Sequence, residues 1–128
     1  MKVLLDTHTF LWWNMDSPQL SPKAKEVIAN PDTDVYFSAA SAWEIAIKHQ
    51  KGRLSLPESP DKYVISRIRY YGFEALPIQI SHTLKTNSLP MIHADPFDRI
   101  LIAQCEMENM KLISSDEMIH QYDVDVIW

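Results

Sequence analysis

Glycine and cysteine are scarce in this sequence, and each shortage excludes a class of binding site. The 128 residues include only two glycines, Gly52 and Gly72, so the chain holds neither a glycine-rich phosphate-binding loop nor a three-glycine dinucleotide-binding motif. The single cysteine, Cys105, excludes an intramolecular disulfide, a four-cysteine zinc site and a CxxC redox pair. This cysteine usage is typical of a reducing compartment, and we expect a cytoplasmic protein.

The sequence also lacks excess positive charge and long apolar runs. Twelve basic residues against 17 acidic residues give a net charge of −5 with the histidines neutral. A nucleic acid would therefore have to be bound through a local basic patch or through metal cations. The first apolar run, residues 3–5, is too short for a signal peptide. No run approaches the roughly 20 residues that span a bilayer, and we expect a soluble protein with no membrane partner.

Apolar residues make up 46% of the chain, which is enough for the core of one domain. No repeat or linker divides the sequence, and we predict a single domain over residues 1–128. Strands are predicted at residues 3–5, 35–37, 74–77, 111–114 and 124–127. Helices are predicted at residues 8–13, 21–29, 39–50, 60–71, 81–86, 96–109 and 116–120. This alternation predicts an α/β fold, a three-layer α/β/α sandwich with a mainly parallel central sheet.

Acidic residues follow three of the predicted strands. Asp6 follows the first strand, Glu44 lies early in the helix after the second, and Asp116 follows the strand at residues 111–114. Parallel sheets bind ligands beyond the carboxyl ends of their strands, and Asp98, in the first turn of a helix, belongs to the same edge. We therefore expect the four carboxylates to share one cleft.

Four carboxylates in one cleft repel one another unless cations bind between them. Mg²⁺ and Mn²⁺ prefer carboxylate oxygens, and they suit a site without cysteine better than zinc does. Such ions can bridge a phosphate and activate water. The pattern therefore indicates phosphodiester hydrolysis.

Each of these acids also has a simpler structural interpretation. Asp6 can cap the following helix, Glu44 can pair with Lys48 four residues later, and Asp116 can be a turn residue. Asp95 and Asp98 have the spacing of a helix N-cap and a first-turn residue, where negative charge is favoured. The histidines show no paired-ligand spacing and are interpreted as structural or peripheral: His8, His49, His82, His93 and His120.

Four stretches, taken in order, resemble the PIN-domain ribonucleases and, among them, the VapC-type toxins of type II toxin-antitoxin pairs. They are VLLDTH (3–8), SAWEIAIK (41–48), HADPFDRILIAQ (93–104) and LISSD (112–116), so the resemblance spans nearly the whole chain. It implies that Asp6, Glu44, Asp98 and Asp116 are the catalytic residues. In this family they hold one or two Mg²⁺ or Mn²⁺ ions that activate water for RNA cleavage.

The resemblance also implies supporting residues and protein partners. The small hydroxyl residue near the last acid is Ser114 or Ser115, and Asp95 is an additional acid found in one branch of the family. Thr7, next to the first acid, is a further supporting residue. The expected partners are an RNA substrate, a cognate antitoxin protein and a second copy of the chain in a homodimer.

Basic residues near these motifs can supply the positive charge that the whole chain lacks. Lys48 and Arg99 lie within the matching stretches and are the predicted RNA-binding residues. Four more basic residues complete the expected local rim, namely Lys51, Arg53, Arg67 and Arg69.

Two other classes of protein remain open. Haloacid dehalogenase-like phosphatases also place an Asp-Thr pair after the first strand, but they require a second Asp where this chain has His8, and no later metal-binding loop of that class is present. A non-catalytic PIN-like module that binds RNA or protein is the main alternative. The presence of all four acids favours the active enzyme.

Overall fold

Five short parallel strands form one sheet in the computed structural model, which describes residues 1–128. The strand order is β3-β2-β1-β4-β5, and each neighbouring pair is parallel. The strands are β1 (Lys2–Leu5), β2 (Asp34–Ser38), β3 (Glu74–Leu76), β4 (Lys111–Ile113) and β5 (Val126–Ile127). The order reverses beside β1, because β2 lies on one side of it and β4 on the other. The carboxyl ends of β1 and β4 therefore form the switch point where ligands bind in such sheets.

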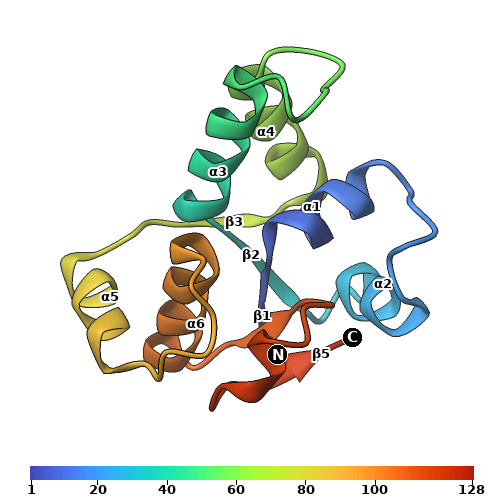
Figure 1. The fold of residues 1–128 in the computed structure, drawn as a ribbon. Coiled ribbons are helices and arrows are strands. Elements are labelled where there is room, and N and C mark those ends of the chain that lie inside the picture. The colour runs from blue at the N-terminus through green and yellow to red at the C-terminus, as the bar shows by residue number, and fades with distance from the viewer.

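Helices cover both faces of this sheet (Figure 1). They are α1 (Thr7–Asn14), α2 (Pro22–Ala29), α3 (Ala39–Gln50), α4 (Pro60–Tyr71), α5 (Ile80–Lys85) and α6 (Pro96–Glu108), with 3₁₀ turns η1 (Thr86–Ser88) and η2 (Ile119–Gln121). Val3 and Leu5 of β1 belong to a core cluster shared with α1 to α4. Leu4 points to the other face, where its cluster includes α6. The predicted three-layer α/β/α sandwich is confirmed, and its sheet is wholly parallel.

Side-chain caps set the starts of the helices that carry the acids. Asp6 caps α1 by accepting a hydrogen bond from the backbone N–H of Thr9 at 2.8 Å. Asp95 caps α6 by accepting from the N–H of Phe97, also at 2.8 Å, and Pro96 occupies the first helical position. These caps place both helix N-termini at the carboxyl edge of the sheet.

Two predicted elements near the C-terminus are shorter in the structure. The helix predicted at residues 116–120 is only the 3₁₀ turn η2, because the carboxylate of Asp116 accepts the N–H of Met118 and forms a turn first. The last strand begins at Val126 rather than 124 and pairs only with the short β4. None of the helices combines the length and the apolar character needed to cross a bilayer.

Buried polar contacts fix the position of α6 against the sheet. The amide of Gln104, with no exposed surface, accepts a 2.6 Å hydrogen bond from Ser38 and donates to the carbonyl of Pro77 at 3.2 Å. Ser38 also caps α3. The same residues therefore position α3 and α6, the two helices that carry Glu44 and Asp98.

Candidate active site

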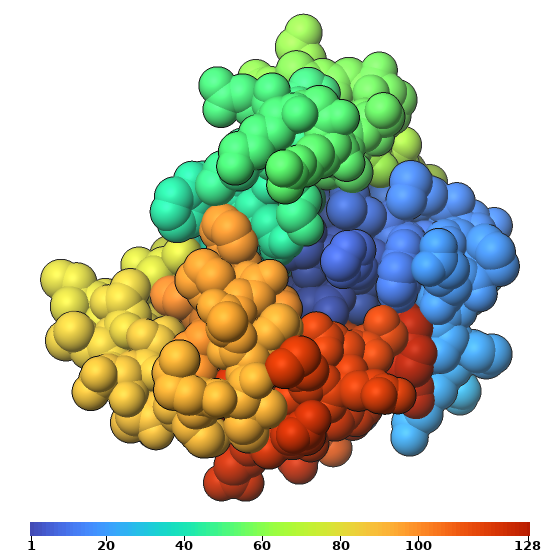
Figure 2. Space-filling view, in the orientation of Figure 1, coloured from blue at the N-terminus to red at the C-terminus, as the bar shows by residue number.

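The four predicted acids line one small cavity at the carboxyl edge of the sheet. Its volume is about 160 Å³, and none of its lining residues is apolar: Asp6, Thr7, His8, Glu44, Lys48, His93, Asp95, Asp98, Ser115 and Asp116. Figure 2 shows teal, orange and red segments meeting around the dark blue N-terminal segment on this face. Residues far apart in sequence thus meet at the switch point of the sheet.

One side of the cavity, which we name the α1–α3 wall, consists of Asp6, Thr7, Glu44 and Lys48. Asp6 and Glu44 are each 5% exposed. One carboxylate oxygen of Glu44 accepts a 2.6 Å hydrogen bond from the hydroxyl of Thr7, and the other lies 2.6 Å from Nζ of Lys48. Asp6 accepts from Thr9, as described above. The carboxylates of this wall therefore already have partners within the chain.

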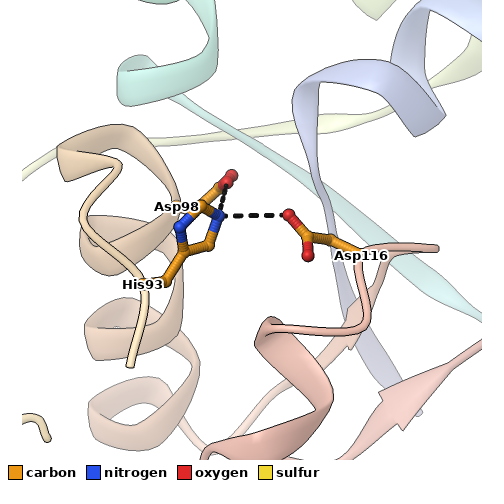
Figure 3. Close-up of side chains that lie close together, drawn as sticks. All are labelled: His93, Asp98 and Asp116. Atoms are coloured by element: carbon orange, nitrogen blue, oxygen red, sulfur yellow. Dashed lines mark hydrogen bonds and ion pairs between the residues drawn. The ribbon is translucent and has the colours of Figure 1, made fainter. Parts of the chain in front are cut away.

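The opposite side, the α6–β4 wall, consists of His93, Asp98 and Asp116. Nε2 of His93 lies 2.9 Å from Oδ2 of Asp98 and 3.1 Å from Oδ2 of Asp116. Figure 3 shows the imidazole between the two carboxylates, which come from the first turn of α6 and from the segment after β4. These three side chains offer ligand atoms that all lie within 4.8 Å of one another. The group combines one nitrogen with two oxygens and suits a divalent cation.

Burial and mutual repulsion make negative charge costly in this cavity. Burial raises the pKa of Asp98 from 3.8 to about 7, and the carboxylates of Asp95, Asp6 and Glu44 add to the shift while His93 opposes it. Burial likewise raises the pKa of Asp6, against hydrogen bonds from Ser114 and Thr9 that lower it. A bound cation would relieve this cost, so the residues fit the divalent ion that the sequence predicts.

Comparison with known proteins identifies the family. The family model of the PIN domain matches residues 3–125. This chain belongs to the PIN domain family. It is similar to ribonuclease VapC16 of Mycobacterium tuberculosis, with 36% identity over 61 residues, which are 48% of this chain and 43% of the relative. It is also similar to ribonuclease VapC22 of the same species, with 23% identity over 94% of this chain and 91% of the relative. The matched segment thus spans less than half the length of the first relative.

Solved structures show the same fold. The PIN domain superposes on a chain of VapBC2 from Rickettsia felis, bound to a promoter DNA fragment, with a TM-score of 0.71 and 12% identity, covering 100% of this chain and 99% of the other. It superposes on a chain of FitAB bound to a DNA fragment with a TM-score of 0.66 and 16% identity, covering 98% and 93%. At these identities, the likeness describes the fold alone.

His93 is the residue of this PIN domain cavity that sequence reasoning missed. The sequence indicates that the histidines are structural or peripheral, yet the imidazole of His93 lies between Asp98 and Asp116. The available signal was its position two residues before the cap Asp95, inside the motif that contains Asp98. His8 also lines the cavity and is exposed, with its ring 5.5 Å from that of Trp12.

The predicted supporting residues lie in or against the cavity. Thr7 binds Glu44, and Ser115 lines the cavity. Ser114 is fully buried, contacts Asp6, and accepts the backbone N–H of Asp116 at 3.1 Å. Asp95 caps α6 and also lines the cavity.

The structure corrects the predicted RNA-binding role of Arg99. This residue is only 9% exposed, and its guanidinium donates to the carbonyls of Thr86 and Pro90 at 2.8 and 2.9 Å and to the hydroxyl of Tyr122 at 3.2 Å. A buried charge requires such partners. Arg99 therefore holds the segment before α6 instead of facing RNA.

A larger groove adjoins the cavity on the side of Lys48. It has a volume of about 420 Å³ and shares Glu44, Lys48 and Asp95 with the cavity; its other lining residues are Ile47, Lys51, Arg53, Ala94, Pro96 and Phe97. The ring of Trp43, a residue 61% exposed, lies 5.3 Å from that of Phe97. Three cations, Lys48, Lys51 and Arg53, thus line the groove beside the acidic cavity, and the exposed ring of Trp43 lies next to the Phe97 of that groove.

Proposed function

We propose that this PIN domain is a Mg²⁺- or Mn²⁺-dependent endoribonuclease and the toxin of a toxin-antitoxin pair. The observation that carries the proposal is that Asp6, Glu44, Asp98 and Asp116 line one polar cavity at the switch point of the sheet. Two relatives named as VapC ribonucleases support the activity, and the VapBC and FitAB names of the structural neighbours support the pairing.

In this proposal the four acids hold the ion or ions. A divalent cation supplies positive charge for the scissile phosphate and Lewis acidity for the attacking water. Thr7 fixes the orientation of Glu44 by its 2.6 Å hydrogen bond, and Ser114 and Thr9 fix Asp6. Because such hydrogen bonds restrict rotation of the carboxylates, the site is organised before substrate binds.

Lys48 is the proposed first contact for the RNA backbone. Its side chain is 40% exposed, pairs with Glu44, and lines both the acidic cavity and the adjoining groove. Lys51 and Arg53 extend the positive charge along that groove, which compensates locally for the net charge of −5. The single-stranded RNA would approach along this groove, with Trp43 available for base stacking.

The proposed protein partners are an antitoxin and a second copy of the chain. Large apolar side chains are exposed on the helices, including Ile80 (78%) and Leu84 (69%), which are one turn apart on α5, and Tyr70 (74%) on α4. Exposed apolar groups of this kind are typical of protein interfaces. A cytoplasmic location would suit a nuclease that acts on cellular RNA.

The test is cleavage of purified cellular RNA by the wild-type protein and by Asp98→Asn, each with Mg²⁺, with Mn²⁺ and with chelator. We expect cleavage by the wild type only when a metal is present, and a loss on the order of 100-fold or more in the variant. Asp32→Asn is the control, since Asp32 is exposed and precedes β2 at the opposite edge of the sheet. Metal-independent cutting, or equal cutting by Asp98→Asn, would refute the proposal. No cutting by folded wild-type protein would favour a binding module.

A further inference from the structure

We infer that His93 is a nitrogen ligand of the catalytic cation, which makes this site a mixed nitrogen and oxygen site selective for Mn²⁺ over Mg²⁺. The inference rests on the metal dependence proposed above and adds a residue beyond the four acids. It starts from the central position of Nε2, at 2.9 Å from Asp98 and 3.1 Å from Asp116 (Figure 3).

The 2.9 and 3.1 Å separations of Nε2 from the two carboxylates match the spacing of neighbouring ligands around one ion. Octahedral ions of this class bind their ligands at about 2.1 Å, so neighbouring ligand atoms lie about 3.0 Å apart and opposite ones about 4.2 Å. The three atoms of the α6–β4 wall all lie within 4.8 Å of one another. One ion can therefore contact His93, Asp98 and Asp116 with only small side-chain adjustments.

Hydrogen bonds to buried side chains hold the backbone of His93 in place on the α6–β4 wall. Its N–H donates to the hydroxyl of Tyr122 at 2.8 Å, and its carbonyl accepts from the guanidinium of Arg99 at 3.4 Å. Tyr122 is 5% exposed and Arg99 is 9% exposed. These buried partners fix the position of the His93 backbone, from which the imidazole projects.

The other ring nitrogen has no strong competing partner. Coordination uses the lone pair of Nε2, so the ring hydrogen must then reside on Nδ1. The contact of Nδ1 with the backbone nitrogen of Asp95 is long, at 3.5 Å, and a small rotation of the ring removes it.

A nitrogen ligand changes which ion the site prefers. Mg²⁺ binds oxygen ligands and water almost exclusively. Mn²⁺ also suits carboxylate oxygens but, as a first-row transition metal, it accepts a nitrogen ligand in a mixed site more readily than Mg²⁺ does. Removing the His93 imidazole should therefore weaken Mn²⁺ binding more than Mg²⁺ binding. A site made of the four acids alone gives no reason for this difference between Mn²⁺ and Mg²⁺ binding.

The experiment is pulsed electron paramagnetic resonance of Mn²⁺ bound to the full chain, with the histidines at natural abundance or labelled with ¹⁵N. We expect nuclear modulation from a directly bound histidine nitrogen that changes on labelling, disappears in His93→Gln and persists in His8→Gln. His8→Gln is the matched control because His8 lines the same cavity. The labelled wild type by itself tests whether any histidine nitrogen binds the ion, and an absence of that coupling already contradicts the inference.

Calorimetric titration of the same proteins supplies the affinities. His93→Gln should weaken Mn²⁺ binding at least about tenfold and Mg²⁺ binding by less. Bound Mn²⁺ without histidine coupling, or coupling that persists in His93→Gln, would overturn the inference and leave the metal site intact. A wild type that binds no Mn²⁺ would overturn both the inference and the proposed metal dependence.

Discussion

The two walls of the cavity carry two acids each but differ in the hydrogen-bond and ion-pair partners of those acids. On the α1–α3 wall, Glu44 has Thr7 and Lys48 as partners, and Asp6 accepts the N–H of Thr9. On the α6–β4 wall, Asp98 and Asp116 converge on the single imidazole of His93. Glu44 on the first wall is therefore already paired with a cation of the chain, whereas both acids of the second wall share one imidazole.

The raised pKa of Asp98 reflects this difference between the walls. Burial and three neighbouring carboxylates raise its pKa to about 7, and His93 is the group that opposes them. Burial also raises the pKa of Asp6, and the hydrogen bonds from Ser114 and Thr9 offset only part of that rise. Ionisation of such a carboxylate lowers the stability of the folded protein. A cation that binds beside it offsets this cost.

The largest effect on stability should come from neutralising Asp98. Its folded pKa of about 7 exceeds the unfolded value of 3.8, so the folded protein is progressively destabilised as the pH rises between these values and bears the full penalty above 7. Asp98→Asn removes the penalty, and because each tenfold change in proton affinity is worth about 1.4 kcal/mol, we expect a gain on the order of 2–4 kcal/mol at pH 8.

Denaturant unfolding with chelator at pH 5 and pH 8 measures this gain. The advantage of Asp98→Asn should grow between the two pH values, and Asp32→Asn should show no such growth. A gain in the free energy of unfolding that is equal at both pH values would mean that ionisation of Asp98 does not destabilise the folded protein.

The next effect should come from the residue that supports the α6–β4 wall. Arg99→Lys keeps the charge but loses the planar group that reaches Thr86, Pro90 and Tyr122 together. We expect a loss on the order of 2 kcal/mol in the free energy of unfolding, because buried carbonyls lose their donors. Urea unfolding checks this value; a change below about 0.5 kcal/mol would show that Arg99 is not held as described.

A third effect compares the walls directly through their affinity for metal. Asp116→Asn should weaken Mn²⁺ binding about tenfold more than Glu44→Gln does, because the carboxylate of Glu44 is already paired with Lys48. Calorimetric titration of both variants gives the ratio. Equal losses, or a larger loss in Glu44→Gln, would show that the α6–β4 wall does not contribute more to Mn²⁺ affinity than the α1–α3 wall.

The smallest effect should appear in RNA affinity along the groove. Replacing Lys51 and Arg53 together with Gln removes two cations beside the cavity, so binding of single-stranded RNA should weaken severalfold, with a shallower dependence on salt. Binding is measured with Asp98→Asn as the background, so that RNA stays intact. Replacing Lys23 and Lys25 of α2 with Gln is the matched control, and an equal loss there would mean that the groove does not guide RNA.

Local signals in the sequence were enough to predict the positions of the four acids. Asp6 follows an apolar strand and caps a helix, and Asp98 lies in the first turn of a helix marked by Asp95-Pro96. Because parallel strands end at one edge, these local signals translate directly into a shared cavity.

The roles of His93 and Arg99 could not be obtained in this way. Arg99 donates to carbonyls nine and 13 residues before it, contacts that fold the segment carrying His93 back onto Asp116. From sequence alone, an arginine in a helix is expected to be exposed and a histidine in a loop to be peripheral. The path of this loop depends on tertiary contacts, which local sequence patterns do not contain.

The decisive measurement for the metal site is anomalous diffraction from crystals of the protein soaked in Mn²⁺. We expect a peak on the α6–β4 wall, about 2.1 Å from the carboxylate oxygens of Asp98 and Asp116. No peak at saturating Mn²⁺, or a peak away from both carboxylates, would contradict this expectation.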